Sequence, residues 1–261
     1  MTEPGGHKAQ IVDQFTQQAE SYTQLTTSLP TRSQSDDLAA FGAVAEDEVL
    51  DVACGSGNLA IPIAPRVRHV TAIDLTPAMI EQGKARQADK GIANIDWIVG
   101  DVDPLPFADA SFSLVMCSAA IHHFERPAAV FREMARVCRP GGRIAIKDMA
   151  FPADKTGAFD AMERMRDPSH VHAHTLSELR ALADGLDLRE ATVEPYATPP
   201  LPLEAILATS FPTEFSMDEI RAIFLSDAES GEDRLGLRTH ASDGALFISY
   251  PMATLVWEKR C

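Results

Sequence analysis

The chain has 261 residues, of which 45% are hydrophobic and 23% are charged, as in ordinary folded globular proteins. Its 23 Lys and Arg residues against 38 Asp and Glu residues give a formal net charge of −15. This charge disfavours phosphate backbones and anionic membranes, so we expect no nucleic-acid partner. The apolar stretches are far shorter than the ~18 residues of a membrane-spanning helix, so no stable membrane insertion is predicted.

The remaining composition favours a cytoplasmic protein. The first residues, MTEPGGHK, lack the basic and apolar regions of a secretory signal. The cysteines are scattered without a CxxC pair, which predicts reduced thiols and no zinc site: Cys54, Cys117, Cys138 and Cys261.

Short apolar or β-branched runs in the first two thirds of the chain predict buried parallel strands. They lie at 49–53, 69–74, 97–101, 112–118 and 143–148. Helical patterns separate these runs, one of them opened by Thr76-Pro77 and another carried by Phe131, Met134, Ala135 and Cys138. Strands alternating with helices predict an α/β fold with a parallel sheet.

The two ends of the chain differ from this pattern. One helical face near the start carries Ile11, Val12, Phe15, Ala19 and Tyr22. Beyond residue 150 we expect a helix at 175–184, a strand at 188–196, helices within 204–230 and a last strand from Ala245 to Trp257. Pro251 either interrupts part of that last strand or places it at an edge. This predicts cap helices (1–45), a binding core (46–196), a helical lid insertion (197–243) and a final core strand (244–261).

Apolar side chains within the predicted lid are consistent with a substrate that has a hydrophobic portion. Ordinary helix packing is the competing explanation for the same residues: Leu201, Leu203, Ile206, Leu207, Phe211, Phe215, Ile223 and Phe224.

The strongest motif is VLDVACGSGNLA at 49–60. A strand ends at an acidic residue, and a glycine-rich turn that opens a helix lets backbone N–H groups approach a ligand. Dinucleotide binding and S-adenosylmethionine (SAM) binding share this plan. Asp74, which ends the second strand, suits a ribose diol in either case and does not decide between them.

Three features favour SAM over a dinucleotide. Ala60 replaces the third glycine of the dinucleotide pattern. Asp51, just before the turn, suits the cationic amino end of a methionine moiety, and Asp101 ends the third strand. Three acidic strand ends around one crevice suit a cationic, hydroxyl-rich ligand better than a diphosphate.

Four segments, taken in order, resemble class I SAM-dependent methyltransferases of the UbiE-like type: VLDVACGSGNLA (49–60), AIDLTPAMI (72–80), GDVDPLPFADASFSLVMCSAAIHHF (100–124) and EMARVCRPGGRIAIKD (133–148). FTQQAESY at 15–22 is similar to that family's entry segment, and ERMRDPSHV at 163–171 to a bacterial subgroup typified by YcgJ. The resemblance covers about residues 11–150. It implies a Rossmann-like, doubly wound sheet of seven strands whose last strand is antiparallel.

The resemblance also implies cofactor contacts at matching positions. These are the SAM loop (Asp51, Ala53, Gly55, Gly57), the ribose and adenine contacts (Asp74, Leu75), the adenine edge (Asp101, Val102), the methionine end (Cys117, Ser118) and two residues closing over the cofactor (Phe15, Tyr22). The chain departs from the family pattern in two places. Ala53 stands where many members have Gly, and Pro62 and Pro65 predict a short or kinked helix after the loop.

Histidines supply the candidate catalytic groups. His122 and His123 follow the fourth strand, at the crevice end of the sheet, where either imidazole could accept a substrate proton or only pack against the next helix. His170, in SHVHAH, is a candidate for the substrate pocket or a solvated loop residue, and we predict no metal because no carboxylate or thiol pattern is nearby. Asp148, at the end of the fifth strand, faces the substrate or serves the structure.

We therefore expect a SAM-dependent methyltransferase that acts on a small molecule. In-line SN2 transfer would move the methyl group to O, N, S or C and release S-adenosylhomocysteine (SAH). Two alternatives stay open: a non-methylating SAM-binding protein, either a cyclase or a binding module, and an NAD(P)-dependent oxidoreductase. The chain is expected to be a monomer or a homodimer.

Overall fold

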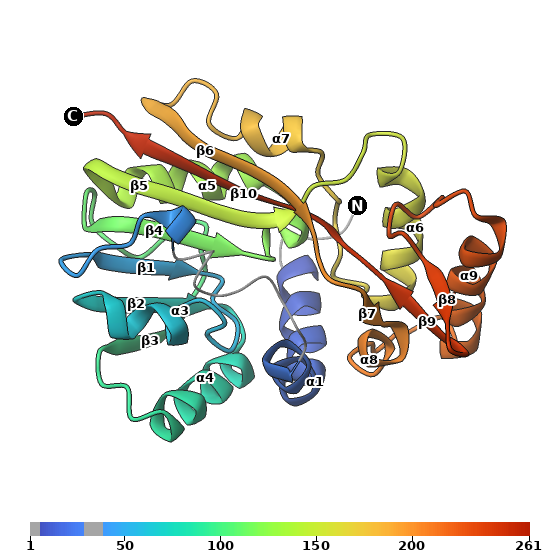
Figure 1. Ribbon diagram of the computed structural model, residues 1–261. Coiled ribbons are helices and arrows are strands. Elements are labelled where there is room, and N and C mark those ends of the chain that lie inside the picture. Colours follow the sequence, from blue (N-terminus) through green and yellow to red (C-terminus); the bar gives the residue numbers. More distant parts are fainter. Residues whose placement is uncertain (1–5, 29–38) are drawn as a thin grey trace.

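The computed structural model describes residues 6–28 and 39–261, and its centre is a seven-stranded sheet of order β3-β2-β1-β4-β5-β10-β6 (Figure 1). Strands β1 to β5 run parallel, and β10 is antiparallel to both of its neighbours, β5 and β6. The predicted seven-stranded sheet with an antiparallel last strand is confirmed. The strands are β1 (Glu48–Val52), β2 (His69–Asp74), β3 (Ile95–Val99), β4 (Phe112–Ser118), β5 (Cys138–Met149), β6 (Leu188–Ala197) and β10 (Pro251–Lys259).

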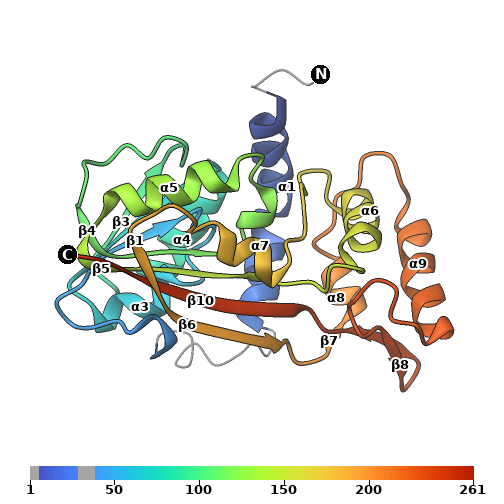
Figure 2. The same cartoon turned by 90° about the horizontal axis from the view of Figure 1, so that it is seen from above.

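Helices cover both faces of this sheet, as Figure 2 shows from above. Helices α5 (Pro127–Val137) and α7 (Leu176–Ala181) pack on one face, and α3 (Ala60–Ile63) and α4 (Pro77–Asp89) on the other. Alternate residues of a strand therefore enter different layers: in β4, Val115 faces the first core and Leu114 the second. Because both faces are buried, the central strands are continuous apolar runs.

The chain after β5 builds a smaller unit beyond one end of the sheet (Figure 1). It contains α6 (Thr156–Arg166), α8 (Leu203–Leu207), α9 (Met217–Ser230) and a three-stranded sheet of order β7-β9-β8 (Leu201–Pro202, Ala245–Ile248, His240–Ser242). Helix α1 (Gly6–Ser28) lies between the large sheet and this unit in both views. Leu25 of α1 packs against the apolar core of the smaller unit.

Several predicted elements differ from the structure in their limits. The strand expected from Ala245 to Trp257 is interrupted just before Pro251, as one of the two alternatives for this proline predicts: β9 pairs within the small sheet, and β10 starts at Pro251 in the large one. The other alternative, an edge position, is wrong, because β10 lies between β5 and β6. Pro251 is tolerated as the first residue of an interior strand, because its missing N–H falls at the strand end. The helical stretch 204–230 is interrupted between α8 and α9.

The predicted proline effect after the glycine-rich loop is confirmed. Helix α3 has only four residues and is followed by the short 3₁₀ helix η1 (Ala64–Arg66). At the start of the chain, the cap helices predicted within residues 1–45 correspond in part to α1. Residues 1–5 and 29–38 of that range lie outside the described residues.

Candidate functional site

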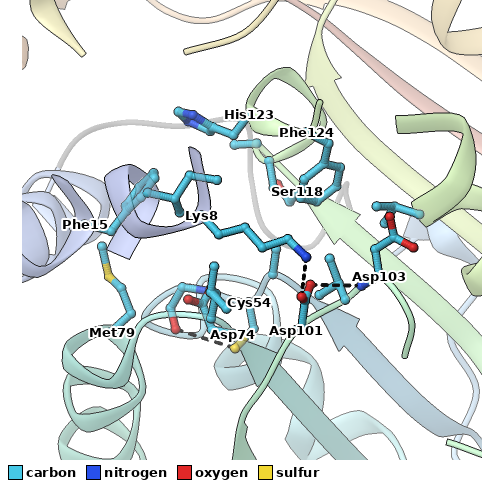
Figure 3. A pocket seen from close by; sticks show the side chains of 18 of the residues that line it. Lys8, Phe15, Cys54, Asp74, Met79, Asp101, Asp103, Ser118, His123 and Phe124 are labelled. Carbon is cyan, nitrogen blue, oxygen red and sulfur yellow. Dashed lines mark hydrogen bonds and ion pairs between the residues drawn. The ribbon is translucent and has the colours of Figure 1, made fainter. Parts of the chain in front are cut away.

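A cavity of about 640 Å³ lies at the carboxyl ends of β1, β2, β3 and β4. Strand order reverses between β1 and β4, which is where open α/β sheets bind ligands. Strand ends form one wall, and Lys8 and Phe15 of α1 lie opposite them (Figure 3). Ile11 and Tyr22 of the same helix also line the cavity. The volume lies within the range of small-molecule and cofactor sites.

Most of the predicted site residues line this cavity: Phe15, Tyr22, Asp51, Ala53, Gly55, Asp74, Leu75, Asp101, Val102, Ser118 and His123. The structure does not bring the other four there. Cys117 is fully buried in the core, and Gly57, His122 and His170 are not among the lining residues.

The glycine-rich turn shows why two of its glycines differ in role. Ala53 and Gly55 have positive φ angles of 52° and 54°, and a Cβ built on Gly55 meets no atom within 4 Å. A Cβ on Gly57 would lie 2.5 Å from the Trp97 ring. Gly55 thus leaves open space at the cavity, whereas Gly57 makes room for Trp97.

Asp51 is a buried carboxylate at the base of the cavity, with only 1% of its surface exposed. Its Oδ2 accepts a hydrogen bond of 3.0 Å from the Ala60 N–H, and no cationic side chain in the described residues pairs with it. Burial, assisted by the charge of Asp74, raises the pKa of Asp51 to about 8. A cationic ligand group would compensate this carboxylate and favour its ionised form.

Asp74 and Asp101 are held by short local contacts. Asp74 accepts hydrogen bonds of 2.8 Å from the N–H groups of both Gly55 and Thr76, which ties the glycine-rich turn to the end of β2. Burial raises the pKa of Asp74 despite these bonds. Asp101 accepts a bond of 3.1 Å from the Asp103 N–H and forms an ion pair with Lys8.

Asp148 organises the 3₁₀ turn η2 (Ile121–His123) from behind the cavity. It accepts hydrogen bonds from the N–H groups of Ala120 (3.0 Å) and Ile121 (2.8 Å) and contacts Nδ1 of His122 at 2.7 Å. Burial opposes the charge on His122, but Asp148 outweighs it and raises the pKa of that imidazole. Asp148 therefore serves the structure, together with His122.

Of the three histidines predicted from the sequence, His123 is the one that lines the cavity. Its Nδ1 lies 3.0 Å from the Ser169 carbonyl oxygen, which can only accept, so Nδ1 carries the proton. Burial, followed by the charge of His122, lowers the pKa of His123 to about 4. The ring packs edge-on against Phe15 at a centroid distance of 5.1 Å. Neutral His123 therefore has an unprotonated Nε2.

His170 and His172 do not line the cavity and contact a carboxylate on α6 instead. Asp160 contacts Nε2 of His170 at 2.7 Å and Nδ1 of His172 at 2.8 Å. The absence of a nearby carboxylate, inferred from the sequence, is therefore wrong, because α6 brings Asp160 back beside the loop. The described residues nevertheless contain no group of three or more His, Cys, Asp or Glu side chains that could hold a metal ion.

The sequence analysis missed the first turn of α1. Lys8 lines the cavity, and His7 Nε2 lies 2.8 Å from the His123 carbonyl oxygen. A signal for both was present: Ile11, Phe15 and Tyr22 follow one helical face, and its continuation by one turn toward the N-terminus reaches His7 and Lys8.

The predicted lid side chains do not line the cavity. Leu203, Ile206, Leu207 and Phe224 are buried in the core of the smaller unit instead. The idea of an apolar substrate portion therefore gains no support from them. No helix within residues 6–28 and 39–261 is both long and apolar enough to cross a membrane.

A parallel sheet with a reversed strand order, one antiparallel strand between β5 and β6, and a ligand cavity at a glycine-rich turn after β1 together define the class I methyltransferase fold. Residues 49–142 match the family model for a methyltransferase domain.

Residues 49–142 are therefore a methyltransferase domain, and the chain is similar to YcgJ, an uncharacterized methyltransferase of Bacillus subtilis (strain 168). The two are 33% identical over 157 residues, which cover 59% of this chain and 62% of YcgJ. A demethylmenaquinone methyltransferase of Renibacterium salmoninarum is 39% identical over 113 residues, covering 43% of this chain and 46% of that protein. The chain thus matches less than two thirds of the length of these relatives.

Among solved structures, BH2331 of Bacillus halodurans C-125, a protein assigned as a methyltransferase, is similar with a TM-score of 0.76 and 25% identity. The match covers 88% of this chain and 99% of that one.

Proposed function

We propose that this chain is a SAM-dependent methyltransferase acting on a small-molecule acceptor. The observation that carries the proposal is that one cavity joins the strand-end carboxylates Asp51, Asp74 and Asp101 to the neutral imidazole of His123. Cofactor and acceptor would thus share a single space. The name of another relative, a ubiquinone/menaquinone biosynthesis C-methyltransferase of Roseobacter denitrificans that is 36% identical over 109 residues, also supports a small-molecule acceptor.

The lining residues fit SAM group by group. Asp51, buried without a cationic partner in the described chain, suits the ammonium group of the methionine end. Asp74 suits the ribose hydroxyls, and Asp101 suits the amino edge of the adenine. Leu75 and Val102 offer apolar contacts to the adenine ring.

SAM, when bound, supplies an electrophilic methyl group on its sulfonium centre. The role of the chain is to position an acceptor in line with that methyl group and to exclude water. Phe15 and Tyr22 of α1 cover the cavity, and His123 Nε2 accepts the proton that the acceptor loses. Because His123 stays neutral above about pH 4, this nitrogen is available at physiological pH.

The direct test uses methyl-labelled SAM and a small-molecule extract, with the label located by mass spectrometry. We expect a labelled metabolite with the wild-type protein and much less of it with Asp51→Asn at limiting SAM, together with calorimetric binding of SAH and no binding of NAD(P). Binding of NAD(P) instead of SAH would contradict the proposal and favour an oxidoreductase.

One structural neighbour suggests a second possible result of the labelling experiment: SAH binding without methyl transfer. The [4+2]-cyclase SpnF shares this fold with a TM-score of 0.65 at 13% identity. If SAH binds but no label moves to any acceptor, the chain belongs with non-methylating SAM-binding proteins, either cyclases or binding modules.

A further inference from the structure

The segment between α6 and α7 is held against the η2 turn, on the far side of His123 from the cavity. The His122 carbonyl oxygen accepts hydrogen bonds from the N–H groups of Val171 (2.9 Å) and His172 (3.2 Å). Backbone bonds therefore fasten this segment directly to the residue before His123. The side chains at the start of the segment have a fixed position relative to the imidazole.

The first four residues of this segment, Asp167-Pro168-Ser169-His170, form a tight turn. The sequence suits it, because Asp at the first position and Pro at the second favour a β-turn. The His170 N–H donates to the Asp167 carbonyl oxygen at 3.1 Å, and Asp167 Oδ1 accepts from the Ser169 N–H at 2.9 Å and from the Ser169 hydroxyl at 2.6 Å. Asp167 thus closes the turn with its backbone and its side chain.

This turn presents two oxygen atoms of Ser169 to His123. The carbonyl oxygen lies 3.0 Å from Nδ1 and the hydroxyl oxygen 3.2 Å from it. Since the Ser169 hydroxyl donates its proton to Asp167, it can only accept from Nδ1–H. Both contacts require a proton on Nδ1 and leave Nε2 as an acceptor, for which the described residues offer no hydrogen-bond donor.

The groups around His123 determine how easily its imidazole can take up a positive charge. His122, paired with Asp148, and His170 disfavour a positive charge on His123, whereas Asp167 favours it. On the α1 side, His7 contacts the carbonyl oxygen of His123 and not its ring. Tyr22 is also buried and lines the cavity. Asp167 is 4% exposed, so solvent screens its charge little.

We propose that Asp167 and Ser169 are positioning residues for His123: they hold the imidazole in the tautomer with an open Nε2 and stabilise the imidazolium formed when it accepts a proton. The inference rests on the proposed methyl transfer. In that step an electron pair of the acceptor atom forms the new bond to the methyl carbon: a lone pair on oxygen or nitrogen, whose X–H pair then stays on that atom, or the C–H pair of an acidic carbon. The pair of the broken S–C bond stays on sulfur, and the proton moves to Nε2. The acceptor class is therefore one that carries an ionisable proton, such as a hydroxyl, an amine or an acidic carbon.

Two substitutions separate charge from geometry. Asp167→Asn keeps an oxygen that can close the turn but removes the charge, so we expect kcat to fall by about 10- to 100-fold while the tautomer is retained. Asp167→Ala removes both, so we expect a mixture of tautomers and a kcat close to that of His123→Ala. SAH affinity should stay within about twofold in each variant, because Asp167 does not line the cavity.

The tautomer is read from ¹⁵N spectra of histidine-labelled protein, which need no turnover. Asp227→Asn is the matched control, since Asp227 is also a buried carboxylate that accepts a backbone N–H, from Arg234 at 2.7 Å, but lies in the smaller unit. It should leave the His123 spectrum and kcat unchanged.

A single Nδ1–H tautomer together with wild-type kcat in Asp167→Ala would overturn the positioning role. Absence of methyl transfer by the wild-type protein with all acceptors would instead overturn the proposed function. The spectra distinguish the two failures, because the tautomer of His123 can be scored without catalysis.

Discussion

Lys8 of α1 and Asp101 after β3 form an ion pair that joins the N-terminal helix to the strand-end wall of the cavity (Figure 3). The same carboxylate is the one proposed to meet the adenine edge. Lys8 and the adenine amino group would therefore compete for Asp101. This ion pair fastens α1 across the cavity that we propose the cofactor occupies.

Replacing Lys8 with Met should tighten SAH binding by about two- to fivefold. The pair is partly exposed, with 42% and 38% of the two side chains accessible, so its contribution is at most about 1 kcal/mol. Calorimetry at low salt measures the effect, which should shrink as salt screens the pair in the wild type. Lys84→Met, which removes a surface pair with Glu81 on α4, is the control and should leave SAH affinity unchanged. Weaker SAH binding by Lys8→Met would show that Lys8 helps to hold the ligand.

The affinity for SAH should rise with pH between pH 6 and 8 and then level off. The burial-raised pKa of about 8 means that Asp51 is mostly protonated in the free protein below that pH, whereas a bound ammonium group favours the carboxylate. Binding therefore releases a proton, and each pH unit below 8 costs up to about tenfold in affinity. Titrations in two buffers of different ionisation enthalpy would detect the released proton.

Asp51→Asn should abolish this pH dependence and weaken binding at pH 8 by about 10- to 100-fold, the effect of losing a charge-assisted hydrogen bond. Asp96→Asn, an exposed carboxylate that pairs with His69, is the control. Unchanged pH dependence in Asp51→Asn would assign the released proton to another group.

Much of the cofactor side of the site could be predicted from the sequence because its signals are local. An apolar run, an acidic strand end and a glycine-rich turn lie within twelve residues at 49–60, and parallel strands bring such ends to one edge. Asp51, Asp74 and Asp101 therefore converge as expected. The same reasoning places His123 at that edge.

The parts of the site and the fold that could not be predicted depend on contacts between distant parts of the chain. His7 meets His123 and Lys8 meets Asp101 across 116 and 93 residues, and no spacing rule encodes either contact. Burial of Leu203 in its own core and burial against a ligand produce the same apolar pattern. Pro251 indicated the break before β10, but the change of partner sheet had no signal, because the residue types are the same on both sides of the break.

Loss of the Asp148 side chain should destabilise the fold most strongly under mildly acidic conditions. Asp148→Ala leaves a buried imidazole and the N–H groups of Ala120 and Ile121 unpaired, so we expect a loss of about 3–5 kcal/mol at pH 5.5. Urea unfolding of the variant and the wild type at several pH values measures this difference.

The sign of the pH effect follows from the two partners. Burial opposes ionisation of Asp148, but the His122 charge outweighs it and lowers the pKa of Asp148, so its contribution is lost as pH falls below its ordinary 3.8. Asp148 raises the pKa of His122, so the contribution of His122 is complete below its ordinary 6.5 and is lost as pH rises through the raised value. The difference between wild type and variant should thus shrink as pH rises from 5.5 through that raised value. A difference that stays constant over the whole pH series would mean that the charge of His122 does not change within it.

Gly83→Ala should lower the free energy of unfolding by about 1–3 kcal/mol and Tm by about 3–10 °C. A Cβ at this position in α4 would lie 2.5 Å from the Trp97 ring, and that ring is fixed because Trp97 Nε1 donates to Gln87 at 2.5 Å. The double variant Gly83→Ala/Trp97→Leu should lose less than the sum of the two single variants.

Gly157→Ala in α6 is the matched control for this substitution. A Cβ there meets no atom within 4 Å, so the helix should gain about 0.5–1 kcal/mol. Thermal unfolding followed by circular dichroism compares the variants. A neutral Gly83→Ala would mean that the Trp97 ring can shift without cost.

The position of β10 between β5 and β6 has a consequence for the order of events during synthesis. The ribosome produces residues 188–197 more than fifty residues before the strand with which they pair, 251–259. Until that strand emerges, the edge of β5 is open and the segment of β6 has no place in the sheet. A nascent chain that already contains the whole 49–142 domain therefore still exposes a strand edge, which chaperones can bind and other chains can join.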